Sequence, residues 1–208
     1  QRFDTDEKST DLLYRCHALA TKGKDFSGPF QKISQRYGEI AEALSLSNQW
    51  QEEMETIKKR LPDEKTADYA ASRGEYLCGK MLAEYLGWDF VDPTEIIFFD
   101  ADGKLDSECT HTLCKVNLQR HEYAVIPGFY GAMPDGSVHT FSRGGSDITG
   151  AIVARAAMAS LYENWPYVPG FLMADPRVVE NPRLINFLTY RELREPSYLG
   201  APVLHQAP

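Results

Sequence analysis

The sequence has no excess of positive charge. It contains 22 lysine and arginine residues against 30 aspartate and glutamate residues, which gives a formal net charge of -8 at pH 7. A protein that binds nucleic acid or an anionic membrane surface through its charge needs a basic face. We therefore expect neither nucleic acid nor a membrane among the partners of this chain.

Long apolar runs are also missing. No stretch approaches the roughly 18 to 20 apolar residues of a transmembrane helix, and the first residues lack the apolar core of a secretory signal peptide. These absences favour a cytoplasmic protein. Because the sequence starts at Gln1 and not at methionine, we expect that its natural amino-terminal end has been cut, cleaved or left out.

Cysteine is scarce, and its spacing is not that of a ligand set. The four cysteines, Cys16, Cys78, Cys109 and Cys114, show none of the close pairs typical of zinc or redox sites. Three of them lie in helix-like segments among apolar neighbours, so we expect reduced, buried thiols. The stretch 100–103 resembles a calcium loop but lacks the terminal glutamate, so it is predicted to be a turn. We expect no metal site formed by the protein alone.

Helix-like and strand-like segments alternate along the chain, and no repeat or linker interrupts them. Apolar residues recur at helical spacing in 12–20, 26–44, 50–61, 66–86, 108–119, 148–161 and 190–199. Strand-like segments cover 88–91, 96–99, 123–129, 138–141 and 184–189. The pattern predicts one α/β domain over residues 1–208, a three-layer sandwich around a mostly parallel central sheet.

The stretch that carries most information is Ser142-Arg-Gly-Gly-Ser-Asp-Ile-Thr-Gly150, hereafter the glycine corner, between a strand and a helix. Its two glycines lack Cβ where the chain turns sharply, and we expect the N–H groups of residues 146–148 to point outward from a helix start. A corner of this kind attracts anions. In parallel sheets, ligands gather at the carboxyl ends of strands, where this corner and the Asp175 loop both fall.

Two opposite charges stand at the glycine corner. The guanidinium of Arg143 can grip a carboxylate with two parallel hydrogen bonds, and the carboxylate of Asp147 suits an ammonium group or a metal. A site that holds both groups is complementary to an amino acid. The alternative is an ordinary loop in which Ser146 caps the helix, because glycine-rich corners recur across α/β folds.

Glu75 is a further candidate. It follows Gly74 in the early part of a long helical pattern, where glycine is unfavourable by up to ~1 kcal/mol relative to alanine unless something approaches closely. The alternative is a glutamate on the solvent face of a helix.

Three segments together resemble aspartokinases of the amino-acid kinase family: 72–75 (Ser-Arg-Gly-Glu), 126–147 and 168–177. Their order and spacing match, and the resemblance extends over about residues 10–204. The family transfers phosphate from MgATP to the side-chain carboxylate of aspartate, which gives aspartyl 4-phosphate. This reaction is the first step toward lysine, threonine and methionine.

The resemblance implies a site for L-aspartate. The implied binding residues are Thr10, Glu75, Arg143, Gly144, Gly145, Ser146 and Asp147. In this assignment Arg143 clamps the α-carboxylate, and Glu75 and Asp147 pair with the α-ammonium group. Arg143 and Asp147 are implied to be catalytic, because clamping both groups leaves only the β-carboxylate free to attack.

The resemblance also implies a nucleotide side, with ATP and its accompanying Mg²⁺ as cofactors. The implied nucleotide-binding residues are Pro166, Tyr167, Leu172, Asp175 and Arg177. Asp175 and Arg177 are implied to lie beside the ribose and phosphates, although a surface ion pair between them is an alternative. At the adenine side the family usually has Thr-Asp after tryptophan, where this chain has Pro166 and Tyr167.

The sequence departs from the family at both ends. The strand with Lys-Phe-Gly-Gly-Ser that opens family members is missing, and the chain stops at Pro208, before the regulatory region. We therefore expect a catalytic-domain fragment with little turnover by itself, and a homo-oligomer favoured by an unpaired sheet edge. Two other functions stay open: a catalytically silent amino-acid-binding module, and a related kinase that acts on glutamate.

Overall fold

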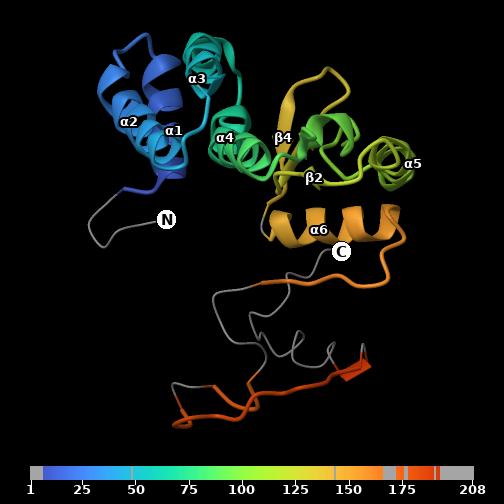
Figure 1. The fold of residues 1–208 in the computed structure, drawn as a ribbon. Helices are drawn as coiled ribbons and strands as arrows, with labels where there is room; N and C mark the ends of the chain where they lie inside the picture. The colour runs from blue at the N-terminus through green and yellow to red at the C-terminus, as the bar shows by residue number, and fades with distance from the viewer. Residues whose placement is uncertain are drawn as a thin grey trace. The chain divides into compact units, whose positions relative to one another are not determined.

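The computed structural model describes residues 7–47, 49–142, 144–165, 172–175, 178–189 and 191–192. The chain divides into two compact units, formed by residues 1–159 and residues 160–208. Helices α1 to α6 and strands β1 to β4 all belong to the first unit (Figure 1).

The first part of this unit is helical. Helix α1 (Ser9–Ala20) packs against α2 (Ser27–Ala43) and α4 (Asp68–Leu86). Helix α3 (Gln49–Arg60), which continues into the 3-10 turn η1 (Leu61–Asp63), packs against α2 and α4. All four helices were predicted from apolar periodicity, with ends that differ by a few residues.

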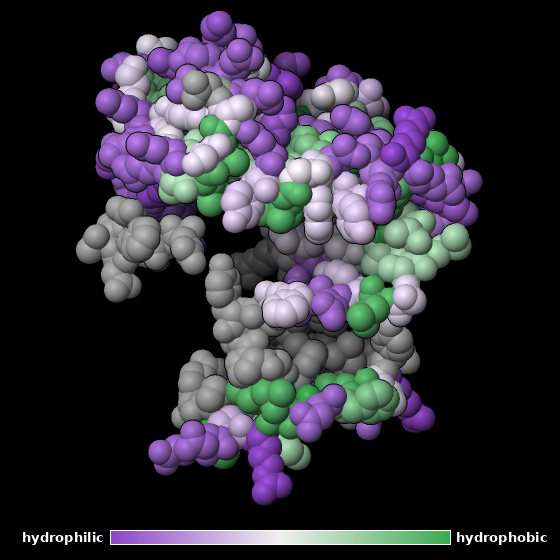
Figure 2. All heavy atoms as spheres, in the orientation of Figure 1, coloured by the Kyte–Doolittle hydropathy of each residue, from purple (hydrophilic) through white to green (hydrophobic). Residues whose placement is uncertain are grey.

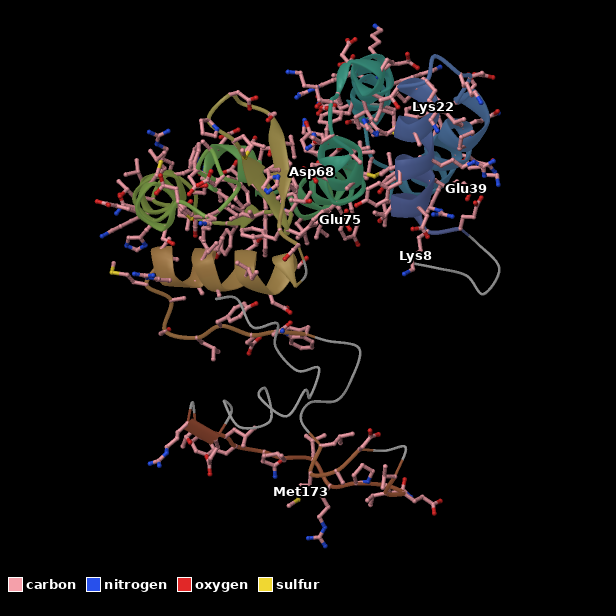
Figure 3. All side chains as sticks on the ribbon, turned by 180° about the vertical axis from the view of Figure 1, so that it is seen from behind. Lys8, Lys22, Glu39, Asp68, Glu75 and Met173 are labelled. Atoms are coloured by element: carbon pink, nitrogen blue, oxygen red, sulfur yellow. The ribbon has the colours of Figure 1, made fainter. Side chains whose placement is uncertain are left out.

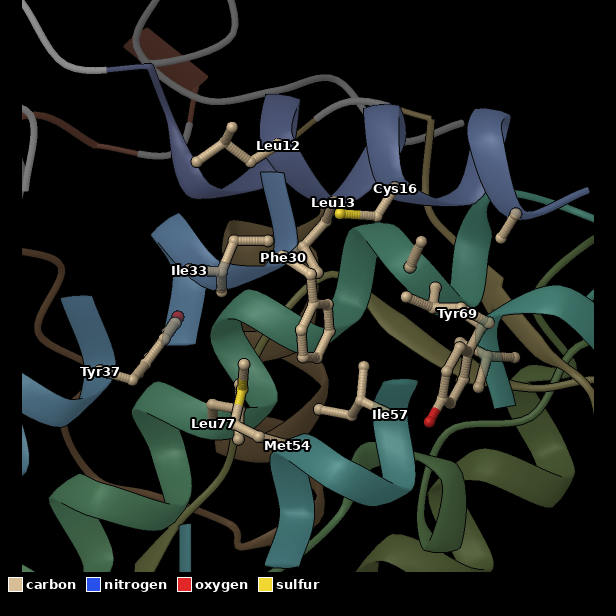
Figure 4. Packing of buried hydrophobic residues seen from close by; sticks show 14 of the residues in the cluster. Leu12, Leu13, Cys16, Phe30, Ile33, Tyr37, Met54, Ile57, Tyr69 and Leu77 are labelled. Atoms are coloured by element: carbon tan, nitrogen blue, oxygen red, sulfur yellow. The ribbon is translucent and has the colours of Figure 1, made fainter. Parts of the chain in front are cut away.

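The helices are held together by the apolar faces that the spacing predicts (Figure 4). This core includes Leu12, Leu13, Cys16, Phe30, Ile33, Tyr37, Met54, Ile57, Tyr69 and Leu77. Helix α4 continues through Gly74, whose carbonyl oxygen accepts a 2.7 Å hydrogen bond from the buried Tyr37 hydroxyl. Leu13 and Tyr37 thus lie close to Gly74, as expected for a glycine at this place in a helix. The apolar pattern predicted over 66–86 does not describe a wholly buried face, because Leu82 and Leu86 at its end are exposed.

Short strands follow the helices. Strand β1 (Asp89–Phe90) pairs in parallel with β2 (Ala124–Val125), with Asp89 opposite Ala124 and Phe90 opposite Val125. The 3-10 turn η2 (Pro93–Glu95) and helix α5 (Ser107–Leu118) lie between them in sequence. The segment 100–103 is a turn, as predicted, in which the Asp100 side chain accepts the N–H groups of residues 102 and 104.

A hairpin leads into the last helix. Strand β3 (Tyr130–Ala132) pairs antiparallel with β4 (Val138–Thr140), and Phe98 forms a parallel bridge to Ala132. Helix α6 (Gly145–Ala156) then packs on α5 around a second apolar core. The strands contain two or three residues each and are shorter than predicted. Only some residues of each predicted strand form backbone pairs with a neighbouring strand.

The second unit contains little regular structure within its described residues. Leu172 and Leu184 form an isolated antiparallel bridge, and the N–H of Met173 donates to the carbonyl of Arg183 at 2.9 Å. Of the strand predicted over 184–189, only the first residue pairs. The helix predicted over 190–199 lies almost entirely outside the described residues, and residues 191–192 are helical.

The burial of the four cysteines can be compared with the expectation of buried, reduced thiols. All four cysteines are free, but only Cys16 and Cys114 are buried, whereas Cys78 is exposed. Burial raises the pKa of Cys16 to about 11, so it is a protonated thiol at neutral pH. Figure 2 shows hydrophilic side chains over the outer faces of α1 to α3. No helix in the described part of the chain is long and apolar enough to cross a membrane.

Candidate functional site

The glycine corner contains an α-helix start without a side-chain cap. Gly144 is the N-cap residue, with the left-handed dihedral φ +61°, and no side chain bonds to the first turn as a cap. Ser146 is therefore not the cap, contrary to the alternative interpretation. Because α6 starts at Gly145 and not at Ile148, the Ile148 N–H already donates to the Gly144 carbonyl at 3.0 Å. The N–H groups that have no partner inside α6 therefore belong to residues 144–147, so of the expected three only that of Ile148 is used within the helix.

The other residues of the corner have defined places. Gly145 is buried, Ser146 is exposed, and Asp147 is half-buried in the first turn of α6, where a carboxylate complements the helix dipole. Arg143 lies outside the described residues. The structure thus brings Gly144, Gly145, Ser146 and Asp147 together, as expected from their adjacency.

The corner packs tightly against the loop that ends the β2 segment. A Cβ added to Gly128 would lie 2.9 Å from the Cα of Ser146, and one added to Gly145 would lie 2.6 Å from the Cβ of Phe129. Real Cβ atoms do not approach this closely, so both positions require glycine. Phe129 itself has φ +68°, which is uncommon for a residue with a side chain.

Glu75 projects from the face of α4 that turns toward this loop. A Cβ added to Gly79 would lie 2.8 Å from the Cγ of Pro127, so this face of α4 touches the loop directly. Glu75 precedes Gly79 by four residues, one helical turn, and therefore lies on the same face. Figure 3 labels the Glu75 side chain on α4. The loop at Pro127 and Gly128 thus contacts both α4 at Gly79 and the start of α6 at Ser146.

The carboxyl group of Glu75 is surface-accessible but partly desolvated by the surrounding protein. This desolvation raises its pKa above the ordinary value of 4.5. The charge of Glu75 in turn contributes, after burial, to the raised pKa of Cys78 one turn later. A carboxylate that is partly stripped of water gains more from an incoming cation than a fully solvated one does.

Thr10 lies on the neighbouring helix. A Cβ added to Gly74 of α4 would lie 3.6 Å from Cδ1 of Leu13 in α1. Thr10 precedes Leu13 by one turn and is half-buried. Arg36 of α2 fixes the start of this helix by donating to the Ser9 hydroxyl at 2.7 Å. Thr10 and Glu75 therefore come from two helices in direct contact.

A buried charge next to Glu75 is a feature that the sequence reasoning missed. Arg73 is only 5% exposed, and its Nη2 donates to the Ser72 hydroxyl at 2.9 Å. Its guanidinium carbon lies 4.2 Å, 4.5 Å and 5.4 Å from the ring centroids of Tyr76, Tyr69 and Tyr130. Aromatic rings four residues before and three residues after an arginine in a helix are the sequence signal that could have indicated this cation–π arrangement.

The predicted nucleotide side is described only in part. Leu172 takes part in the bridge to Leu184, and the carbonyl of Asp175 accepts the N–H groups of Val178 and Val179, both at 2.9 Å. Pro166, Tyr167 and Arg177 lie outside the described residues, and so does the alternative ion pair of Arg177. Asp175 belongs to the second unit.

Dedicated metal ligands are not gathered in the described structure. No group of three or more histidine, cysteine, aspartate or glutamate side chains there could hold a metal ion.

The fold and the glycine corner define a class of protein. The model of the amino acid kinase family matches residues 17–207, and the chain belongs to this family. Among curated relatives, aspartokinase 3 of Bacillus subtilis is 34% identical over an alignment that covers 99% of this chain and 48% of that protein.

Solved structures agree with this assignment. The aspartate kinase of Clostridium acetobutylicum matches with a TM-score of 0.90 and 48% identity, over 99% of this chain and 47% of that one. Aspartokinase III of Escherichia coli, in complex with aspartate and ADP, matches with a TM-score of 0.78 and 25% identity, over 96% of this chain and 49% of that one. The predicted α/β fold is confirmed, and the chain spans about half the length of these relatives.

Proposed function

We propose that this chain belongs to an aspartate kinase, which transfers the γ-phosphoryl group of ATP to the side-chain carboxylate of L-aspartate and forms aspartyl 4-phosphate. The observation that carries the proposal is the glycine corner, an uncapped helix start with Asp147 in its first turn, packed on the loop that touches the Glu75 face of α4. The likeness to aspartokinases along 99% of the chain supports the choice of substrate.

The proposed roles follow from charge. Arg143 and the amides of Gly144, Gly145 and Ser146 bind the α-carboxylate, because helix N-termini favour anions. Thr10 adds a hydroxyl to that contact. Glu75 and Asp147 bind the α-ammonium group as its two carboxylate partners.

Positioning supplies most of the catalysis in this proposal. With both α-groups held, only the β-carboxylate is free to attack the γ-phosphorus of ATP. A carboxylate is already ionised at neutral pH, so the reaction needs no general base. Arg143 and Asp147 act as catalytic residues in the sense that they orient the attacking group.

ATP and its metal complete the proposed reaction. We assign Pro166, Tyr167, Leu172, Asp175 and Arg177 to the nucleotide side, on the family resemblance. The E. coli relative that was solved with aspartate and ADP supports a site for both ligands. Mg²⁺ enters with ATP, where phosphate oxygens provide most of its ligands and neutralise charge.

The setting of the reaction also belongs to this proposal. Aspartyl 4-phosphate formation is the entry to lysine, threonine and methionine synthesis, and we infer a cytoplasmic enzyme that forms a homo-oligomer. Light scattering of the purified protein measures the oligomeric state, and a monomer at all concentrations would contradict that part.

Calorimetric titration of the full-length protein with aspartate, and then with MgATP, tests the proposal. Arg143→Ala should weaken aspartate binding by more than about 2 kcal/mol, the magnitude of a lost charge-assisted carboxylate pair. Arg155→Ala is the matched control, because Arg155 is an exposed arginine in the last turn of the same helix. It should leave aspartate affinity unchanged.

The two other functions are outcomes of the same experiment. Aspartate binding without any MgATP binding or aspartate-dependent ADP release would favour a silent amino-acid-binding module. Tighter binding and faster turnover of glutamate than of aspartate would favour a glutamate kinase. Equal loss of affinity in Arg143→Ala and Arg155→Ala would remove the carboxylate clamp from the proposal.

A further inference from the structure

The hydroxyl of Thr149 joins two backbone segments at the glycine corner. Thr149 is 4% exposed and lies in the second turn of α6. Its Oγ1 donates to the carbonyl oxygen of Gly145 at 2.8 Å and accepts the N–H of Phe129 at 3.0 Å. The one proton of the hydroxyl and one of its lone pairs are thus both used inside the protein.

The N–H group that Thr149 accepts belongs to a residue in an unusual conformation. Phe129 has φ +68°, and its carbonyl accepts the N–H of Phe141 at 2.9 Å. Conformations of this kind persist where the surroundings determine them completely. The Thr149 hydroxyl provides such a determinant, because it gives a partner to a backbone donor that is turned toward α6.

No side chain separates the two segments at this point. Gly128 touches Ser146 and Gly145 touches Phe129, so the backbones are in van der Waals contact. Close packing prevents the segments from approaching further, and the Thr149 hydroxyl prevents them from separating. Together these contacts fix the position of the first turn of α6 relative to the loop at residues 126–129, hereafter the Phe129 loop.

We propose that Thr149 is a positioning residue for aspartate, because its hydroxyl holds the Gly145 end of α6 and the Phe129 loop in one fixed geometry. The inference rests on the proposed function, in which the amides of the first turn bind the α-carboxylate. Thr149 is not among the residues assigned to ATP. Loss of its hydroxyl should therefore change aspartate binding selectively.

The chain offers a matched control for this test. Thr110 of α5 is 1% exposed, and its hydroxyl accepts the N–H of Phe98 at 2.9 Å. It is therefore a buried helix threonine that bonds to the backbone of a neighbouring segment, as Thr149 does. It lies outside the residues assigned to aspartate or ATP, so Thr110→Val reports the general effect of losing such a bond.

The experiment compares Thr149→Val, Thr149→Ser and Thr110→Val in the full-length protein. Valine keeps the shape and removes the hydroxyl, whereas serine keeps the hydroxyl. Aspartate and MgATP affinities are measured by calorimetry, KM and kcat by coupled assay, and Tm by thermal unfolding. We expect Thr149→Val to weaken aspartate binding and raise the KM for aspartate about tenfold or more, with MgATP affinity unchanged. Thr149→Ser should stay within about threefold of the parent protein, and Thr110→Val should lower Tm without this selective change.

Each other result overturns one specific statement. If the parent protein binds no aspartate, the proposed function fails, and the role of Thr149 fails with it. If the parent protein binds aspartate and Thr149→Val loses affinity for both ligands equally, or for neither, the positioning role alone is wrong. Should Thr149→Val fail to fold, Thr149→Ala replaces it, and unchanged aspartate affinity in that variant would overturn the inference.

Discussion

At the scale of single residues, Glu75 is assigned to aspartate binding, and its charged form lowers the stability of the ligand-free fold. Its pKa is raised by desolvation, so the folded state favours the protonated form more than the unfolded state does. The contribution of Glu75 to stability is therefore greatest at low pH. It is lost as the pH rises through the raised pKa of the folded state.

Glu75→Gln tests both properties together. We expect the variant to have a Tm at pH 7 equal to or above that of the parent protein, because it removes a partly desolvated charge. At the same time its aspartate affinity should fall about tenfold or more, because the ammonium group loses an anionic partner. Thermal unfolding at pH 7 and pH 4, together with calorimetry, measures the two effects.

The control for this prediction is Glu42→Gln, which changes an exposed glutamate near the end of α2. It should alter neither aspartate affinity nor the dependence of Tm on pH. A lower Tm for Glu75→Gln with intact aspartate binding would show that Glu75 has a structural role, and would remove it from the site.

At the scale of secondary structure elements, Asp68 at the start of α4 ties this helix to the β3–β4 hairpin. Its Oδ1 accepts a 2.7 Å hydrogen bond from the Thr140 hydroxyl, and its Oδ2 lies 3.2 Å from Nδ1 of His139. Both partners are in β4, only a few residues before the glycine corner. The contact therefore links the helix that carries Glu75 to the strand that leads to Asp147.

Asp68→Ala should lower the free energy of unfolding by about 1–3 kcal/mol, because it removes two partly buried contacts and leaves the Thr140 hydroxyl without its acceptor. Chemical denaturation measures this change. Asp102→Ala is the control, because Asp102 is an exposed aspartate in a surface turn. Equal destabilisation by both substitutions would mean that the tie between α4 and β4 contributes nothing specific.

The elements also show how far the sequence could predict the fold and the site. Helices α1 to α4 were predictable because Leu12, Leu13 and Cys16, and their counterparts on the other helices, repeat at the spacing of one buried face. The start of α6 was placed three residues too late. Two adjacent glycines do not reveal which one takes the left-handed conformation, and in the structure it is Gly144.

Contacts between distant segments could not be read from the sequence. The hydroxyl of Thr149 looked like that of any helix threonine, because its bond to Phe129 spans 20 residues. From the sequence, Arg73 stood out only as part of the motif at 72–75. In the structure it is buried, and neighbouring aromatic rings stabilise its charge. Residues adjacent in sequence, such as Gly144 to Asp147, were grouped correctly for the simple reason that they are neighbours.

At the scale of the whole molecule, the two units differ in how they are stabilised. Both apolar cores consist of residues between Leu12 and Ala156, within the first unit. Most of the large apolar side chains described in the second unit are exposed, among them Leu161, Met173, Val178 and Phe187. Burial of apolar surface is the main favourable contribution to folding, so the first unit holds most of the stability of this chain.

From this we expect residues 1–159 to fold without residues 160–208. The shortened chain keeps both cores, the glycine corner, Thr10 and Glu75, so it should retain a cooperative thermal transition and the helical circular dichroism of α1 to α6. It should also bind aspartate within about tenfold of the longer chain, while MgATP binding is lost with the residues assigned to the nucleotide. A chain ending at Leu118 is the control, because it deletes α6, the β3–β4 hairpin and most of the partly buried residues that pack on the second core, and it should unfold without a cooperative transition. If the 1–159 chain also lacks such a transition, residues 160–208 are needed to complete the fold, and the two units are one cooperative body.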